Sequence, residues 1–363
     1  MCSAFYRGAG STVLRAKKSK RNSAKSSRSA RPGAPRLVDV ARVAGVSQMT
    51  ASRALGKPEL VSEETQRRVK AAVAQLGYVP NLLAGGLASK RSRVVAAVVP
   101  HIAGSIFNET IESMIEELAA AGYQVTLGLG GSSNPREDVL IESLLSRRPD
   151  GMILTGMVRS PATRSLLRRA DVPVVEIWDL PADPIDMVVG FSHERVGAEV
   201  AAFMLKRGYR RPHILCADGP RAHARRQGFV KALLAKGKGK REPPCELAPA
   251  PGSVRAGREG LAKLLTRGDR PDFIMCSSDM LALGVLLEAA ARGLRIPEDF
   301  EIFGFGDMQF AVEVTPPLNT VRIDGAMIGR QTAKLLLQRA AGRKPEQSVI
   351  DVGFTIVDRT KAR

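Results

Sequence analysis

The segment from Ser47 to Arg53 concentrates hydrogen-bonding side chains on a short stretch of chain. An arginine can donate two hydrogen bonds to a guanine, and a glutamine can pair with an adenine. Short hydroxyls such as those of Ser47, Thr50 and Ser52 suit phosphate oxygens, where they position a surface without reading a base sequence. The chemistry available to this segment is therefore contact with a nucleic acid.

Three short helices are predicted between residues 36 and 80, and they must position this segment. Gly45-Val46-Ser47 makes a tight turn, after which Ser47 is placed to cap the second helix. Ser62 opens a third helix and Gly77 ends it. Two helices joined by a short glycine turn are typical of a helix-turn-helix. Apolar residues at helical spacing form one face of the first helix: Leu37, Val40, Ala41 and Ala44.

The positive charge of the chain is concentrated at its N-terminal end. The 363 residues carry a formal net charge of +19. Residues 1–91 contain 18 Lys or Arg and 4 Asp or Glu, whereas the rest contain 37 and 32. This asymmetry favours a polyanionic partner for the N-terminal part. Residues 1–35 have no acidic residue, so we predict a disordered basic tail, which either adds weak phosphate contacts or is an inert extension.

The segment LVDVARVAGVSQMTASRAL, residues 37–55, resembles the helix-turn-helix of the LacI/GalR (lactose-repressor) family, whose pattern is D-V-A-x-x-A-G-V-S-x-x-T-x-S-R. The resemblance implies sequence-specific binding to double-stranded operator DNA, in which Gln48, Met49 and Arg53 read bases. Met49 either contacts a thymine methyl group or packs within its own domain. Tyr78 is implied to contact the DNA backbone.

Residues 81–92 are expected to form a hinge between two domains. Members of the family carry a short hinge helix here, with a leucine that wedges between base pairs in the minor groove. Asn81, Ala84 and Leu87 match that pattern, Asn81 as a backbone contact. Two glycines precede Leu87, and each costs roughly 1 kcal/mol of helix stability relative to alanine. We therefore expect the hinge to form only on DNA; a plain flexible linker is the alternative.

Residues 93–363 alternate apolar strands with amphipathic helices, which predicts an α/β body with parallel sheets and right-handed crossovers. Two such sets suggest two lobes, with a ligand cleft at the carboxyl ends of the strands. The first set of strands is Val94–Val99, Gln124–Leu129, Gly151–Leu154, Val174–Ile177 and Met187–Val189. The second set is His213–Cys216, Phe273–Cys276, Glu301–Phe303 and Thr320–Ile323. Predicted helices include Asn108–Ala121, Arg195–Arg207, Arg225–Ala235, Met280–Arg292 and Ala326–Ala341.

The resemblance extends over this body and implies a periplasmic-binding-protein-like domain that binds a small sugar-like effector and dimerises. Within it, the resemblance assigns Arg225 and Asp279 to the effector. An aspartate can accept bonds from two hydroxyls, and an arginine can clamp hydroxyls or a carboxylate. A helix N-cap is the other interpretation of Asp279, and Ser278 departs from the family's common Asn. Weaker candidates, for which core packing is the alternative, are Ser105, Phe107 and Trp178.

Within the family, the segments PVVEIWD, DMVVGFSHERVG and DVGFTIV look most like those of gluconate-utilisation repressors. Arg221, Arg225 and Arg226 would suit a carboxylate near the predicted cleft, although solvated surface charge is the other interpretation. We therefore expect a repressor that responds to gluconate or a related sugar acid, with a neutral sugar or a nucleobase as alternatives. The family also implies a homodimer. Whether the effector releases or tightens DNA binding stays open.

Other functional classes find little support in the chain. Its glycine turns match neither a dinucleotide fingerprint nor a P-loop, and no nucleophile elbow occurs, so we expect no enzyme. The dispersed cysteines and histidines have no metal spacing, so no metal or cofactor is expected. The chain contains no run of about 18 apolar residues, the length needed to span a membrane. The N-terminus lacks the apolar run of a secretory signal, which favours a cytoplasmic regulator over an exported sugar-binding protein.

Overall fold

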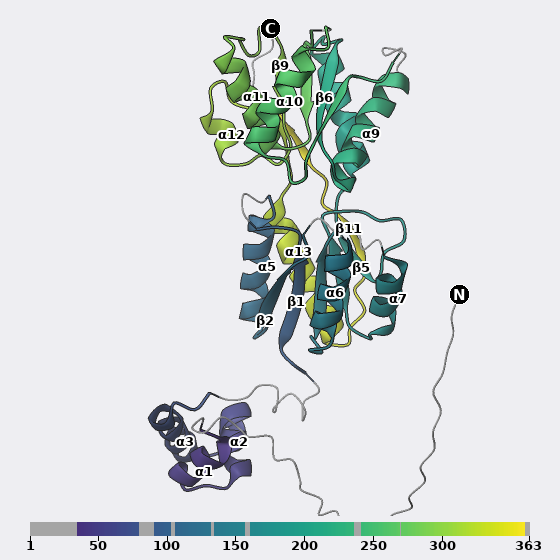
Figure 1. The fold of residues 1–363 in the computed structure, drawn as a ribbon. Helices are drawn as coiled ribbons and strands as arrows, with labels where there is room; N and C mark the ends of the chain where they lie inside the picture. Colours follow the sequence, from purple (N-terminus) through teal and green to yellow (C-terminus); the bar gives the residue numbers. More distant parts are fainter. Residues whose placement is uncertain are drawn as a thin grey trace, which may run out of the picture. The chain divides into compact units, whose positions relative to one another are not determined.

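The computed structural model describes residues 35–79, 91–102, 106–131, 134–156, 160–235, 241–268 and 270–359 (Figure 1). The chain divides into two compact units, Met1–Gly85 and Gly86–Arg363, here called the head and the body.

The head contains the three predicted helices, α1 (Leu37–Ala44), α2 (Gln48–Gly56) and α3 (Glu63–Leu76), with a short 3-10 turn, η1 (Pro58–Leu60), between the last two. The predicted caps are confirmed. The Ser47 hydroxyl accepts a bond from the Thr50 amide at 3.1 Å, and the Ser62 hydroxyl accepts one from the Thr65 amide. Gly45 ends α1 in the left-handed region, with φ 62°, where a side chain would be strained.

Small side chains let the three helices of the head pack closely. Each helix contributes buried residues to one cluster, and most of these residues are alanines. Alanine favours the helix and needs little space between helices. The cluster consists of Val40, Ala41, Ala44, Ala51, Ala54, Val69 and Ala72. The faces opposite this cluster are left for solvent or for a partner.

The first lobe of the body is built on a six-stranded sheet in which every pairing is parallel, in the order β11-β5-β4-β3-β1-β2. Five of its strands are those of the first predicted set. Their bounds are β1 (Val94–Val99), β2 (Gln124–Leu129), β3 (Gly151–Thr155), β4 (Val174–Ile177) and β5 (Met187–Gly190).

Helices cover both faces of this sheet, so most residues of its central strands are apolar. In Figure 1, α5 (Asn108–Ala120) and α13 (Gly325–Ala340) lie on one face, and α6 (Asn134–Leu145) and α7 (Pro161–Arg169) lie on the other. Residues of β1 alternate between two cores: Val95 and Ala97 belong to one, Ala96 and Val98 to the other. This burial on both sides explains the continuous apolar run of β1.

The sixth strand, β11 (Val349–Asp351), comes from the far end of the chain and was not predicted. It pairs in parallel with β5, and α13 packs against α5. The two lobes are therefore not two consecutive halves of the body, because the C-terminal segment returns to the first lobe.

The second lobe carries a four-stranded parallel sheet, β7-β6-β8-β9. Its strands are β6 (Pro212–Ala217), β7 (Cys245–Ala248), β8 (Phe273–Cys276) and β9 (Glu301–Phe303). Its helices are α8 (His193–Lys206), α9 (Pro220–Ala235), α10 (Val254–Leu265) and α11 (Asp279–Ala291), with the short α12 (Phe310–Glu313) after β9. Strand β7 was not predicted.

The prediction that Thr320–Ile323 belongs to a parallel sheet is wrong. This segment forms β10 (Thr320–Arg322), which pairs antiparallel with β12 (Thr355–Val357) in a separate two-stranded sheet. The antiparallel partner comes from a terminal strand that the apolar pattern did not reveal.

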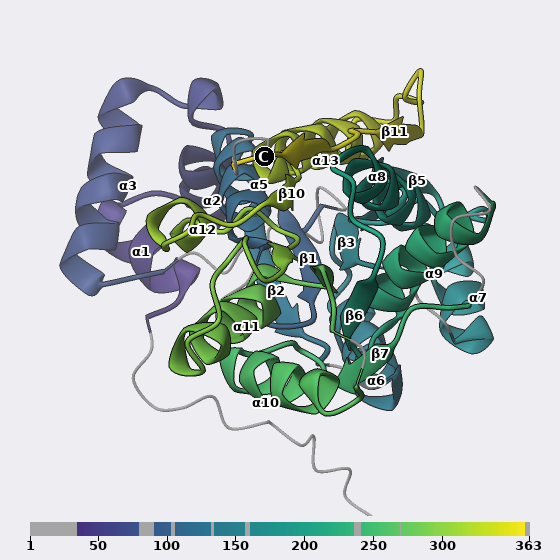
Figure 2. The same ribbon diagram turned by 90° about the horizontal axis from the view of Figure 1, so that it is seen from above.

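Helices α8 and α9 lie side by side and cross in close contact (Figure 2). A Cβ at Gly197 would stand 1.9 Å from the Arg225 carbonyl oxygen, and one at Gly228 would stand 1.9 Å from the Glu194 carbonyl oxygen. Only glycine permits this approach. The crossing brings His193, at the start of α8, next to Arg225 of α9. Both residues line the cavity that is the candidate functional site of the body.

Candidate functional site

The outer face of α2 presents the side chains that the sequence assigned to DNA. Ala51 and Ala54 of α2 are buried in the head, whereas Gln48, Met49 and Arg53 are exposed. Met49 is 65% exposed, so it does not pack within its own domain in this structure. An exposed apolar side chain beside a glutamine and an arginine is suited to a groove that offers both methyl groups and hydrogen-bonding base edges.

Two hydroxyls of the same segment, those of Ser47 and Thr50, already have partners within the head. Ser47 Oγ lies 2.9 Å from Thr50 Oγ1 and caps α2, while Ser52 is exposed. Tyr78 is partly buried and packs against the head core. Its hydroxyl remains a candidate for a phosphate contact. Asn81, Ala84 and Leu87 lie outside the described residues.

Arg68 of α3 holds the turn between α1 and α2, a role that the sequence interpretation missed. Its guanidinium donates hydrogen bonds to the carbonyl oxygens of Ala44 and Gly45. These carbonyls lie at the C-terminal end of α1, where a cation also interacts favourably with the helix dipole. A Cβ at Gly45 would stand 2.6 Å from the Arg68 guanidinium. The glycine therefore supplies both the turn and the space for this arginine.

The body contains a cavity of about 420 Å³ lined by residues of both lobes. Phe107, Trp178 and Arg225, three of the predicted effector residues, line it. Ser105 lies outside the described residues. The remaining lining side chains come mainly from the carboxyl ends of strands and from the segments that follow them, for example Thr155, Asp179, Ala217 and Ser277. This is the location expected for a ligand in parallel α/β sheets.

Arg225 is a buried cation whose hydrogen-bond partners are all neutral. Its side chain donates from Nη1 to His193 Nδ1 at 2.9 Å and from Nη2 to the Ser277 carbonyl oxygen at 2.7 Å. Its guanidinium carbon lies 3.8 Å from the centre of the Phe305 ring, a cation–π contact. Burial lowers the pKa of Arg225 to about 9. Its buried Nε has no hydrogen-bond partner among the described residues.

His193 joins the two lobes through its neutral ring. Because Arg225 can only donate, His193 Nδ1 is the acceptor, and the proton stands on Nε2, which donates to the Trp178 carbonyl oxygen at 3.0 Å. Burial, with Arg225 and Arg221 nearby, holds the pKa of His193 well below its usual value. The ring therefore adds no charge to the cavity at neutral pH.

Arg221, from the second lobe, forms an ion pair with Asp179, from the first lobe, in the wall of the cavity. Its Nε donates to Asp179 Oδ2 at 2.7 Å, and its guanidinium lies over the Phe107 ring. Asp179 Oδ1 also lies 3.4 Å from His193 Nε2. The sequence interpretation did not single out Asp179 or His193. A usable signal was present, since each polar residue follows closely on a buried strand, β4 or β5.

Trp178 forms the inner wall of the cavity and is 2% exposed. Its backbone has φ 68°, and its indole Nε1 donates to Thr110 Oγ1 at 3.1 Å. Its ring system makes T-shaped contacts with Phe107 and Phe191. It is the only tryptophan of the chain.

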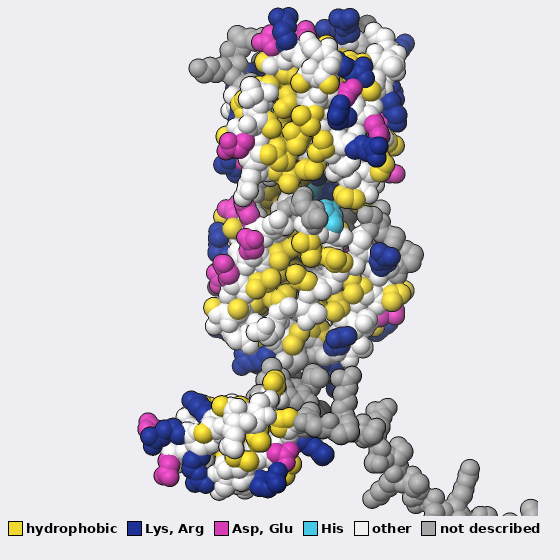
Figure 3. Space-filling model, turned by 60° about the vertical axis from the view of Figure 1, so that its left-hand side comes forward, with side chains coloured by type: hydrophobic (Ala, Val, Ile, Leu, Met, Phe, Trp, Pro, Cys, Tyr) yellow, Lys and Arg dark blue, Asp and Glu magenta, His cyan; other side chains and the backbone are white. Residues whose placement is uncertain are grey.

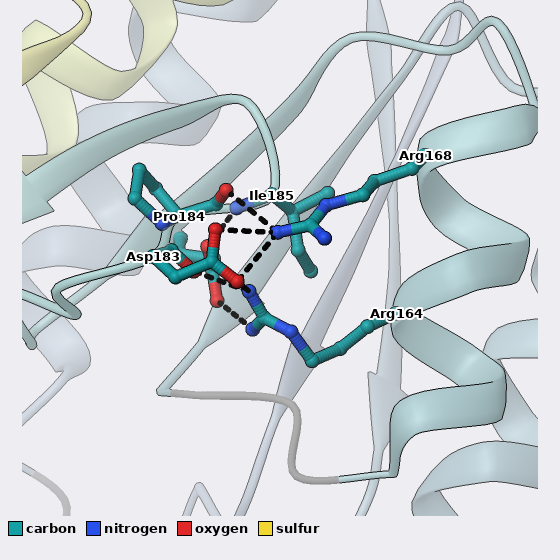
Figure 4. Close-up of polar contacts among 6 residues, drawn as sticks. Arg164, Arg168, Asp183, Pro184 and Ile185 are labelled. Atoms are coloured by element: carbon teal, nitrogen blue, oxygen red, sulfur yellow. Dashed lines mark hydrogen bonds and ion pairs between the residues drawn. The ribbon is translucent and has the colours of Figure 1, made fainter.

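The loop that begins with Trp178 and Asp179 is held at its far end by charged groups (Figure 4). Arg164 and Arg168 of α7 both reach the Asp183 carboxylate, Arg168 at 2.7 Å. The fully buried Glu176 accepts a bond from the Ile185 amide at 2.7 Å and lies 3.6 Å from Arg164. Burial raises the pKa of Glu176. This network fixes the β4–β5 loop, and with it one wall of the cavity.

Asp279 lies beneath the cavity instead of lining it. It is fully buried; Oδ1 accepts a bond from the Thr320 hydroxyl at 2.6 Å, and Oδ2 accepts one from the Met308 amide at 2.8 Å. Burial raises its pKa to about 6. The N-cap interpretation is wrong, because Ser278 caps α11 by accepting a bond from the Leu281 amide. In this structure Asp279 joins β10 to the segment after β9.

Arg226 does not belong to the cavity wall. It pairs with Glu242 at 3.1 Å. It differs in this respect from Arg221 and Arg225, which both line the cavity. Of the three arginines that the sequence suggested for a carboxylate, two therefore line the cavity.

The described residues contain no group of three or more His, Cys, Asp or Glu side chains that could hold a metal ion. No helix among them is long and apolar enough to cross a membrane.

Comparisons with known proteins agree for both units. Residues 36–81 match the model of bacterial regulatory proteins of the lacI family, and residues 201–360 match the periplasmic binding protein-like domain. The HTH-type transcriptional regulator GntR of Pseudomonas aeruginosa is 37% identical over 90% of this chain and 95% of its own length. GntR of Escherichia coli K12 is 30% identical over 89% of this chain and 97% of its own length.

Solved structures give the same result. A lacI-family transcriptional regulator from Silicibacter pomeroyi superposes with a TM-score of 0.83 at 34% identity, covering 89% of this chain and 98% of that chain. The lac repressor dimer bound to operator and an anti-inducer superposes with a TM-score of 0.77 over 90% of this chain and 98% of that chain. At 24% identity, that likeness shows the fold alone. The named relatives are transcriptional regulators, and the chain belongs to the lacI family of bacterial regulatory proteins as a DNA-binding transcriptional regulator.

Proposed function

We propose that this protein is a repressor whose operator affinity is controlled by a sugar acid, gluconate or a close relative, bound in the cavity of the body. The observation that carries the proposal is that the buried guanidinium of Arg225 has only neutral partners. Such a buried charge lowers the stability of the folded protein, and a ligand carboxylate would supply the missing counter-charge. The names of the two GntR relatives agree with a gluconate-related role for them. Phe107 and Trp178 would enclose the carbon chain of the ligand.

Calorimetry with the purified full-length protein tests the ligand class. Gluconate should bind more tightly than glucose or ribose, because only the acid neutralises Arg225. Arg225→Gln should abolish this preference. Arg226→Gln is the matched control, since it removes a neighbouring cation that pairs with Glu242 outside the cavity, and it should keep the preference. Equal affinity of the parent protein for gluconate and glucose would refute the sugar-acid proposal.

For the head, we propose that Gln48, Met49 and Arg53 read operator bases, and that Ser47, Thr50, Ser52 and Tyr78 stand at the DNA backbone. We also propose a division of the chain into a basic tail (residues 1–35), a DNA-binding domain (36–80), a hinge (81–92) and an effector-binding domain (93–363). Asn81, Ala84 and Leu87 would complete the contact from the hinge. Footprinting at low salt on the DNA upstream of its own and adjoining genes tests this; absence of any protected site would refute it.

The effector acts through linkage between the two sites. A ligand that binds one conformation of the body better than another shifts the protein towards it, and the operator affinity changes by the difference in affinity. We propose that the sugar acid lowers operator affinity. Titration of a protein–operator complex with gluconate tests the sign, since an increase in affinity would make the ligand a corepressor.

We further propose a homodimer in the cytoplasm, where a DNA-binding regulator finds the chromosome. Figure 3 shows apolar side chains gathered on one face of each lobe of the body. The exposed apolar residues of the body include Leu129 of β2, Leu287 of α11 and Val312 of α12. Apolar faces of this kind mark contact surfaces. Analytical ultracentrifugation tests the proposal, which a monomer at micromolar concentration would contradict.

A further inference from the structure

The two arginines of the cavity differ in whether a carboxylate of the protein neutralises them. Arg221 and Asp179 form an ion pair at 2.7 Å. Arg225 has no ion-pair partner among the described residues, and its bonds go to His193, to a carbonyl oxygen and to an aromatic ring. Among Arg221, Arg225 and Asp179 there are therefore two cations and one anion, and the cation without a protein counter-charge is Arg225.

The other titratable groups of the cavity wall add no further positive charge. His101 and His193 both have a pKa below the usual value, because burial and the neighbouring Arg221 disfavour their charged forms. Glu137 and Asp218, which also line the cavity, are acids. Asp218 is mostly exposed and faces His223 at 3.3 Å. A second ligand carboxylate would find no free cation and would meet these acids.

We propose that Asp179 is a specificity-determining residue: by neutralising Arg221 it limits the effector to a single carboxylate. The inference rests on the proposed sugar-acid function and deepens it. Asp179 lies in the first lobe and Arg221 in the second, so both charges reach the cavity only in the assembled body. The ligand class is therefore the monocarboxylic sugar acids, and the dicarboxylic acids with the same carbon chain are rejected.

A double-mutant cycle on Asp179 and Arg221 tests this proposal through ligand affinities and leaves Arg225 unaltered. Gluconate, glucarate and glucose share one carbon chain and carry one, two and no carboxylates. In the parent protein gluconate should bind more tightly than glucarate. Asp179→Asn frees Arg221 and should raise the glucarate-to-gluconate affinity ratio by about tenfold, the size expected for one nearby buried charge.

The opposite variant gives the reverse result. Arg221→Gln leaves Asp179 without its cation, so the gluconate-to-glucose ratio should fall by about tenfold. The double variant, Asp179→Asn with Arg221→Gln, removes both charges and should restore the ratios of the parent. A purely structural role for the pair would lower all three affinities together without changing the ratios. Fluorescence of the sole tryptophan, Trp178, reports whether the wall beside Asp179 is intact in each variant.

The outcomes separate this inference from the proposed function. If the parent binds gluconate and glucose equally, the sugar-acid function fails and the inference fails with it. If the parent prefers gluconate to glucose but binds glucarate as tightly, only the inference fails. It also fails if Asp179→Asn leaves the glucarate-to-gluconate ratio unchanged, or if the double variant does not restore that ratio. Should Asp179→Asn not fold, Arg221→Gln and the double variant still decide the matter.

Discussion

The head and the body place their functional side chains in opposite ways. In the head, Gln48, Met49 and Arg53 lie on one exposed face of a single helix. In the body, the cavity gathers Phe107, Trp178 and Arg225 from distant parts of the sequence, and these side chains are buried. A site on one helix needs only that helix and its caps, whereas a buried site needs the whole tertiary structure. Changes in the two regions should therefore have different consequences.

The largest expected effect is that of Gly197→Ala in the body. The new methyl group would collide with the Arg225 backbone in the α8–α9 crossing, and because backbone atoms cannot rotate away, the helices would have to separate. We expect a loss of about 3 kcal/mol or more in the free energy of unfolding of the body, with weaker gluconate binding. Urea denaturation followed by Trp178 fluorescence measures it. Gly208→Ala is a weaker control, because a Cβ there meets nothing within 4 Å although its φ is 90°. Equal losses in both variants would contradict the packing explanation.

The next effect is a pH dependence of body stability through Asp279. Burial raises the pKa of this acid from 3.8 to about 6, so the folded protein holds the proton more tightly than the unfolded chain. Its contribution favours folding at low pH and is lost as the pH rises between these two values. The change in the free energy of unfolding is about 3 kcal/mol for a pKa shift of about two units. The unfolding free energy of the parent relative to Asp279→Asn should fall over this pH range, as measured by urea denaturation. A difference that stays constant with pH would contradict the raised pKa.

Arg53→Ala in the head should weaken operator binding by about 1–3 kcal/mol and relax the base preference at one operator position. Body stability and gluconate affinity should not change, because Arg53 is an exposed residue of the head. Fluorescence anisotropy with operator variants measures the effect. Arg42→Ala on α1 is the charge-matched control, and it should lower affinity for all sequences to a similar, small extent. Equal loss on every operator variant after Arg53→Ala would exclude base reading by this residue.

The smallest effect is that of Ser47→Ala, which removes the cap of α2. The Thr50 amide would lose its acceptor, at a cost of about 1 kcal/mol in head stability. Hydrogen exchange of the α2 amides should become faster by the corresponding factor. Ser52→Ala, on the exposed face, is the control and should leave the exchange rates unchanged. Faster exchange in both variants would mean that capping is not the cause.

The sequence predicted most of the secondary structure but not all of the connections between elements. The head helices and the apolar strands of both sheets were predictable, because their signals lie within a few residues. Strands β7, β11 and β12 were missed, since each is three or four residues long and none is fully buried. The pairing of β11 with β5 brings together Val349 and Val188, which no local pattern relates.

The candidate site shows the same division. Arg225 was predicted from the resemblance, and the structure places it at the cavity. Asp279 was predicted on the same grounds, yet its two oxygens are engaged by Thr320 and Met308. Whether a polar side chain faces a ligand or a buried partner depends on groups far away in the sequence.

By itself the sequence determined the helix that we propose reads DNA, its caps, the alternation of strands and helices, and the presence of arginines near a cleft. These features depend on side-chain type and on spacing of one to four residues, which the chain order states directly. Only the tertiary structure decided that Asp179 neutralises Arg221 while Arg225 keeps its charge. Coulomb interactions act through distances in space, and those distances exist only after both lobes have folded around the cavity.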